Sequence, residues 1–137
     1  MAADLNRKVD AIEEMTGQIE ARYPQTVAEY TARLRASIEE LIGQNVDETR
    51  LLTEVAVMAD RSAIAEETVR LHSHIQQLRE CFAKSEPIGR RLDFLVQEMN
   101  REINTVASKA NSAGAARFVV DVKSEIEKIR EQIQNIE

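Results

Sequence analysis

The chain has 137 residues, 43% of them hydrophobic but only 4% aromatic, a composition that fits one helix-rich domain and argues against an open β-sheet. Its 18 basic and 24 acidic residues give a formal charge of −6, so the whole molecule should not attract polyanions, and any contact with nucleic acid has to be local. A single cysteine excludes an internal disulfide, the N-terminus lacks a signal-peptide pattern, and no apolar run reaches the ~20 residues of a membrane span, so we expect a cytoplasmic chain without membrane contact.

The first predicted elements flank Pro24. Apolar residues recur at helical spacing over residues 5–19 and 27–41, which predicts two helical runs with one direction or a single kinked helix. Gly43 is expected to end this region, and Asp47 is a suitable N-cap for the short helix that follows. The apolar positions of that helix are Leu51, Val55 and Met58.

Three further helices follow in the pattern. Ser62 is expected to cap the first of them, which should run to about Ala83. Pro87 suits the first position of the next helix, predicted from Pro87 to Ala110, because no N–H donor is needed there. The last helix alternates apolar spacings of three and four, as a coiled-coil seam does, and has to pack on another helix. The seam consists of Val119, Val122, Ile126, Ile129, Ile133 and Ile136.

These elements predict an all-α fold, an elongated helical bundle of about five helices with a coiled-coil-like C-terminal helix. We expect one domain over residues 1–137, with a long N-terminal helical arm over residues 1–42 and a helical bundle over residues 47–137. No internal repeat or low-complexity linker interrupts the pattern.

The helix predicted over residues 87–110 carries an unusual polar face. Asn, Ser and Thr are poor residues for a helix interior, yet four of them fall between Asn100 and Ser108. Together with arginine and glutamine, such side chains bind phosphate and ribose oxygens, while the carboxylates of Glu98 and Glu102, four residues apart, can hold a hydrated cation. The alternative is that these groups bond neighbouring helices. The line of the face is Arg90, Gln97, Arg101, Asn104 and Ser108, flanked by Asp93 and Asn100.

Two histidines lie on the preceding helix, at positions 72 and 74, and point to different sides, so they cannot chelate one ion together. His74 shares a face with Glu67 and Arg70, which suits a general base, a metal ligand or a phosphate contact; the alternative is a half-exposed histidine paired with Glu67. Cys81 is expected to be a buried thiol. The chain has no P-loop or GxGxxG motif, so we expect no nucleotide cofactor.

The run GRRLDFLVQEMNRE over residues 89–102, continued by Asn104-Thr105 and Ser108-Lys109, resembles the signature of the YicC/YloC family. The flanks agree with this, in Ala65-Glu66-Glu67, Arg70-Leu71 and Ser73-His74 upstream and in IREQIQNIE over residues 129–137. The resemblance covers essentially the whole chain and is strongest from Asp60 onward. Family members are about twice as long and begin with a separate N-terminal region.

The resemblance implies a bacterial endoribonuclease that acts on RNA, depends on a divalent cation, Mn²⁺ or Mg²⁺, and assembles as a ring-like homo-oligomer, a hexamer in the full-length family. It implies catalytic roles for His74, Glu67, Glu98 and Glu102. It implies metal ligation by Asp93, Glu98 and Glu102. It implies RNA or phosphate binding by Arg70, Arg90, Arg91, Gln97, Asn100, Arg101, Asn104 and Lys109.

The leading hypothesis is therefore phosphodiester cleavage in RNA, with His74 as acid or base. The alternative is a non-catalytic oligomerisation or RNA-clamping module, which the seam from Val119 to Ile136 and the absence of the family's first half favour.

Overall fold

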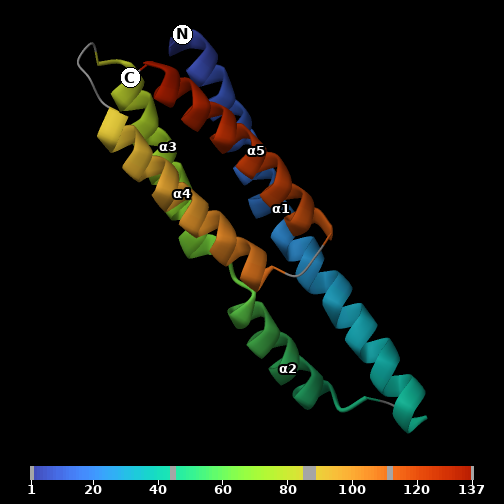
Figure 1. Ribbon diagram of the computed structural model, residues 1–137. Coiled ribbons are helices and arrows are strands. Elements are labelled where there is room, and N and C mark those ends of the chain that lie inside the picture. Colours follow the sequence, from blue (N-terminus) through green and yellow to red (C-terminus); the bar gives the residue numbers. More distant parts are fainter. Residues whose placement is uncertain (1, 44–45, 85–88, 111–112, 137) are drawn as a thin grey trace.

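The computed structural model describes residues 2–43, 46–84, 89–110 and 113–136, and the regular secondary structure of this part is entirely helical. These helices are α1 (Ala2–Ile42), α2 (Glu48–Arg61), α3 (Ala65–Phe82), α4 (Gly89–Lys109) and α5 (Ala113–Ile136). They form an elongated body, in which the first half of α1 lies with α3, α4 and α5 while the second half projects beyond them (Figure 1). The predicted all-α elongated bundle is confirmed. None of the described helices is long and apolar enough to cross a membrane.

A single apolar core holds four of the helices together. The first half of α1 contributes Leu5, Val9, Ile12 and Ile19, and the seam of α5 contributes Val122, Ile126, Ile129 and Ile133, all buried. The prediction that α5 packs on another helix is confirmed, since it lies against both α4 and α1. The side chain of Ile136 lies outside the described residues. The alternative hypothesis used this seam as a surface for oligomerisation. The described part of the seam faces the chain's own core, so it is not exposed for contact with a second chain.

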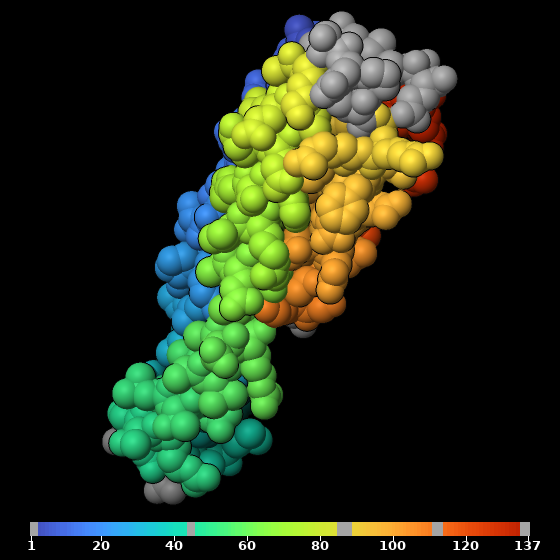
Figure 2. Space-filling view, turned by 90° about the vertical axis from the view of Figure 1, so that its left-hand side faces the viewer, coloured from blue at the N-terminus to red at the C-terminus, as the bar shows by residue number. Residues whose placement is uncertain are grey.

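The remainder of α1 and α2 form an extension of the bundle, which narrows below α3 and α4 in Figure 2. Leu51 is the only hydrophobic residue of α2 that is fully buried. The start of α1 therefore packs within the bundle, and α2 packs with the rest of α1 in the extension. The expected division into an arm over residues 1–42 and a bundle over residues 47–137 stays a prediction.

The ends of α1 and α2 follow the sequence signals. Gly43 has a φ of 64° and ends α1 in the left-handed conformation that glycine tolerates. Asp47 caps α2 as predicted, because its carboxylate accepts hydrogen bonds from the backbone N–H groups of Thr49 and Arg50 at 3.1 and 3.3 Å. An ion pair between Arg35 and Glu48 joins the two helices of the extension.

One local prediction needs correction. Ser62 does not cap α3; it ends α2, where its hydroxyl donates to the Met58 carbonyl at 2.8 Å, and α3 follows Ile64 without a side-chain cap. Of the two arrangements expected around Pro24, the single helix is the one that forms, since α1 is continuous through it. Apolar faces on either side of Pro24 pack against different partners, and this packing outweighs the lost backbone hydrogen bond. In the described part α4 spans Gly89–Lys109; Pro87, its predicted first residue, lies outside the described residues.

Candidate active site on helices α3 and α4

Helices α3 and α4 lie side by side and bring the predicted site residues toward each other (Figure 2). On α3 the residues at positions 67, 70 and 74 follow helical spacing and form one stripe, as do those at positions 98, 102 and 109 on α4. The two stripes face each other where α3 and α4 pack together, so charged side chains that are distant in sequence come into contact.

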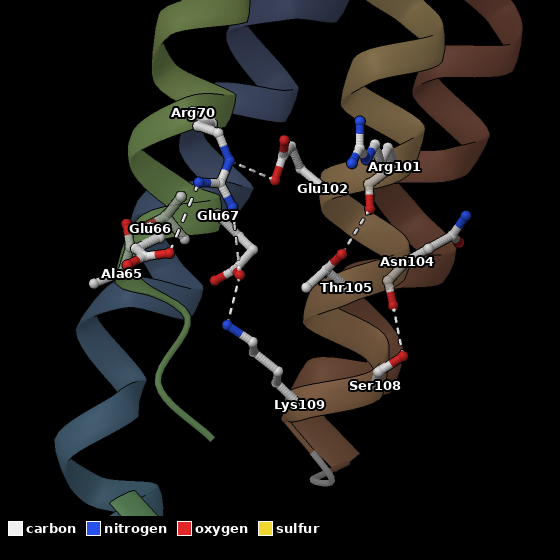
Figure 3. A network of polar contacts seen from close by, with 11 residues as sticks. Ala65, Glu66, Glu67, Arg70, Arg101, Glu102, Asn104, Thr105, Ser108 and Lys109 are labelled. Carbon is white, nitrogen blue, oxygen red and sulfur yellow. Dashed lines mark hydrogen bonds and ion pairs between the residues drawn. The ribbon is translucent and has the colours of Figure 1, made fainter. Parts of the chain in front are cut away.

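A network of ion pairs joins the first half of α3 to the second half of α4 (Figure 3). Arg70 is at its centre: its Nε lies 2.9 Å from Oε2 of Glu102, and its Nη2 lies 3.5 Å from Oε1 of Glu67. Lys109 donates to the same Glu67 oxygen at 2.7 Å. Glu67 and Glu102 are only 1% and 5% exposed, so both carboxylates are held by cations inside the protein.

The opposite charges of this network stabilise the ionised form of each side chain. Burial raises the pKa of Glu67, but the hydrogen bond from Lys109 and the positive charges of Lys109 and Arg70 outweigh it, so the pKa lies below its ordinary value. The pKa of Arg70 is raised by its hydrogen bond to Glu102, and that of Lys109 by its hydrogen bond to Glu67. Neither cation is therefore free to bind phosphate unless an existing pair opens.

A second cluster also joins α3 and α4 and shares Glu102 with the network. His74, Glu98 and Glu102 each offer one ligand atom, and these three atoms lie within 4.8 Å of one another. The Nδ1 atom of His74 is buried and has no hydrogen-bond partner in the described part of the chain. One imidazole and two carboxylates form a donor set that suits Mn²⁺ or Mg²⁺. The buried nitrogen without a hydrogen-bond partner agrees with such a use, so these residues fit a divalent cation.

Two predictions about these residues are refined by the geometry. His74 does not pair with Glu67, because one oxygen of Glu67 accepts from Lys109 and the other has no partner among the described residues. Asp93, which the resemblance placed among the metal ligands, is not part of the cluster. It precedes Glu98 by five residues and therefore lies on a different side of α4.

The polar face of α4 remains largely open to solvent. A shallow hollow is lined by Gln97, Asn100, Arg101, Asn104, Thr105 and Ser108. The hydroxyls of Thr105 and Ser108 are used within the helix, where they donate to backbone carbonyls at 3.1 Å (Figure 3). In the described part of the chain, no hydrogen bond or ion pair joins the side chains of Gln97, Arg101 or Asn104 to another helix. The face therefore presents free donors, as an RNA-binding surface requires.

The other candidates lie outside this hollow. Arg90 and Arg91 are both exposed near the start of α4, and Arg91 donates to Oε1 of Gln77 at 3.3 Å. His72 points away from the site and bonds Glu20 of α1 at 2.5 Å, which confirms that the two histidines serve different sides of α3. Cys81 is a free, buried thiol, as predicted.

The pairing of Lys109 with Glu67 could not be found from the sequence. Both residues were candidates, but they are 42 positions apart, and Lys109 was expected to bind phosphate. No local spacing indicates which carboxylate a lysine will meet across two helices. The basic character of the last turn of α4 was the only available signal.

Comparison with known proteins extends these observations. A family model described as "Endoribonuclease YicC-like, C-terminal" matches residues 19–137. A protein of Clostridioides difficile (strain 630) named "Probable endoribonuclease YicC" is 47% identical over 139 residues, which cover 100% of this chain and 47% of the relative. A protein of the same name from Haemophilus influenzae is 35% identical over 133 residues, which cover 97% of this chain and 46% of the relative. The chain thus spans about half the length of these curated relatives.

Proposed function

Since this chain belongs to the YicC-like C-terminal endoribonuclease family, we propose that it carries the metal-dependent active site of an endoribonuclease that cleaves phosphodiester bonds in RNA. The observation that supports this most directly is the cluster of His74, Glu98 and Glu102, whose ligand atoms lie within 4.8 Å of one another beside an open polar face. The names of the relatives indicate RNA cleavage, and we place this reaction at the cluster.

In this proposal His74, Glu98 and Glu102 hold one Mn²⁺ or Mg²⁺ ion. When bound, such an ion polarises the phosphoryl oxygens and lowers the pKa of an attached water. We assign His74 to the metal in preference to the acid–base role expected from the sequence, because one of its ring nitrogens lies within 4.8 Å of the two carboxylate ligand atoms and its buried Nδ1 has no hydrogen-bond partner in the described chain. Asp93 has no part in this assignment.

The other residues act on the substrate or on the ligands. Arg70 fixes one oxygen of Glu102 at 2.9 Å and so restricts the rotation of a ligand carboxylate. Arg101 and Arg90 are exposed and contact phosphates, while the amides of Gln97, Asn100 and Asn104 suit ribose hydroxyls. Arg70 and Lys109 maintain the structure of the site in this scheme, which differs from the phosphate contacts expected of them.

The test combines metal binding with cleavage. Titration of the chain with Mn²⁺, followed by calorimetry, is expected to show binding that the Glu98→Gln, Glu102→Gln double variant weakens at least about tenfold. Cleavage of an end-labelled structured RNA should require the cation, stop with EDTA and be lost in the same variant. Glu80→Gln, which changes an exposed glutamate of α3, serves as the matched control. Unchanged Mn²⁺ affinity and cleavage in the double variant would falsify the metal assignment.

A His74→Ala variant separates its two candidate roles. As a ligand, His74 is needed for tight Mn²⁺ binding; as an acid or base alone, its loss would slow cleavage and leave the affinity for Mn²⁺ unchanged. A substrate that lacks the 2′-hydroxyl at the cut site then shows whether that hydroxyl takes part.

The second candidate function is an RNA-clamping module without catalysis, which the free donors on α4 also favour. Cleavage by the intact C. difficile relative together with RNA binding but no cleavage by this chain would support it. Homo-oligomerisation stays a prediction, and light scattering on both proteins would measure it.

A further inference from the structure

A larger hollow, of about 550 Å³, lies beyond the lower end of the ion-pair network. It is lined by residues from the middle of α1, the end of α2, the segment between α2 and α3, and the end of α4. Apolar side chains such as Leu34 and Met58 line part of it, and polar side chains line the rest. A volume of this size with a mixed lining is typical of sites for small organic groups.

Both tyrosines of the chain line this hollow, and the chain contains no tryptophan. Tyr23 and Tyr30 are seven residues apart on α1, so they lie on one face of the helix. The Tyr23 hydroxyl donates to the carbonyl of Ala59 at 2.5 Å, which holds that ring in place. Tyr30 is half-buried, and its hydroxyl has no hydrogen bond within the described residues. The hollow therefore has one fixed ring and one ring that is free to contact a ligand.

The charges at the hollow favour an anionic group. Arg33 lines it, is exposed and forms no ion pair with any described residue. Arg33 follows Tyr30 by three residues on α1, so its guanidinium lies about one helical turn from the tyrosine ring. Arginine binds phosphate through paired N–H groups, and aromatic rings stack on bases, so the two together suit a nucleotide.

Lys109 connects the hollow to the proposed active site. It lines the hollow and donates to Glu67, which in turn lies beside Arg70 and Glu102. Lys109 follows Glu102 by seven residues, or about 10 Å along the helix at ~1.5 Å per residue. The hollow and the metal cluster therefore lie close enough along α4 for one RNA strand to contact both.

We propose that this hollow binds an unpaired nucleotide of RNA, with Tyr30 stacked on the base and Arg33 paired with its phosphate. The inference rests on the proposed function, because it takes RNA as the substrate. It adds a requirement that the polar face of α4 alone does not impose: a single-stranded nucleotide next to the cleavage site. In a fully paired duplex every base is paired and stacked, so a duplex should not occupy the hollow.

The two tyrosines provide the experiment with its own reporter, since no other residue of the chain emits under excitation at tyrosine wavelengths. The metal-free chain, kept in EDTA so that RNA is bound but not cut, is titrated with a single-stranded adenosine hexanucleotide. Tyrosine emission should fall on binding after correction for absorption by the RNA. A blunt-ended duplex RNA should leave the emission unchanged.

Variants assign the effect to residues. Tyr30→Ala should weaken hexanucleotide binding about tenfold, as measured by the anisotropy of a dye-labelled strand, because stacking on one ring is lost. Tyr30→Phe keeps the ring and should bind like the unmodified chain. Arg33→Ala should weaken binding about fivefold and reduce its dependence on salt. Arg130→Ala removes an exposed arginine of α5 and should have no effect.

The proposal is wrong if Tyr30→Ala and Arg33→Ala bind the hexanucleotide as tightly as the unmodified chain and the hexanucleotide leaves the tyrosine emission unchanged. That result would indicate that the hollow binds a protein segment instead. Circular dichroism on each variant confirms that it is folded before binding is compared. The outcome is separable from that of the proposed function: quenched emission without cleavage in Mn²⁺ supports the nucleotide site and contradicts the nuclease, whereas cleavage without quenching does the reverse.

Discussion

Replacing Glu67 with glutamine measures what the charge of a buried carboxylate contributes to this fold. Glutamine has the shape of a protonated glutamate, so the substitution removes the charge and leaves the packing. In the unmodified chain Glu67 is 1% exposed and accepts from Lys109 at 2.7 Å. Hydrogen bonds to charged groups contribute about 1.5–3 kcal/mol and neutral ones about 1 kcal/mol, so we expect Glu67→Gln to lower the free energy of unfolding by about 1–2 kcal/mol at pH 7.

The pH dependence of this difference follows from the pKa. The pKa of Glu67 in the folded chain lies below its ordinary value of 4.5, because Lys109 and Arg70 outweigh burial. The folded state therefore holds the proton less tightly than the unfolded state. The stabilisation is fully present above pH 4.5 and is lost as the pH falls through the lower pKa of the folded state. The two proteins should approach equal stability in acid, where Glu67 is protonated and resembles glutamine.

Urea unfolding followed by circular dichroism, at pH 7 and at intervals down to pH 3, measures both quantities. Glu80→Gln is the control, since that glutamate is exposed on the same helix and its loss should change little at any pH. A stability difference for Glu67→Gln below about 0.3 kcal/mol at pH 7, or one that persists unchanged in acid, would show that the ion pairs do not stabilise the native state.

Three further predictions concern other parts of the molecule. The pKa of Asp4 is lowered to about 2, chiefly by the hydrogen bond from Gln132, so an NMR titration should find its midpoint near that value and Gln132→Leu should raise it. Arg70→Met removes the cation that fixes one oxygen of Glu102, so calorimetry should find Mn²⁺ binding weakened about tenfold; unchanged or tighter binding would contradict the positioning role of Arg70. Ile126→Lys places a charge in the core and should abolish cooperative thermal unfolding, whereas Val120→Lys, at a position that is 66% exposed, should not; a folded Ile126 variant would contradict the position of the seam.

The sequence was sufficient wherever one helix determines the outcome. The spacing of Val122, Ile126, Ile129 and Ile133 requires a continuous apolar stripe, and the structure buries all four. Asp47 was a reliable cap because its carboxylate reaches only the N–H groups that follow it. Ser62 was not, because its hydroxyl also reaches the carbonyl of the preceding helix and donates there.

The sequence indicates which candidate residues lie near one another on each helix, but not how they pair between helices. The proximity of Glu98 and Glu102 follows from the pitch of a helix, whereas the approach of His74 depends on how α3 is placed against α4, which no local pattern encodes. The same is true of Arg70 and Lys109. Their charges suggested phosphate binding, but each forms an ion pair with a buried carboxylate of the facing helix.

The continuity of α1 has a consequence for amide hydrogen exchange. The first half of this 41-residue helix is fixed in the core, whereas the second half rests mainly on α2, which buries one hydrophobic residue fully. Local opening of a helix depends on the packing around it and not on its length. Amide protons of a single helix should therefore exchange in two classes: those from about Val9 to Ile19 only on global unfolding, and those beyond Thr26 through openings that leave the bundle intact.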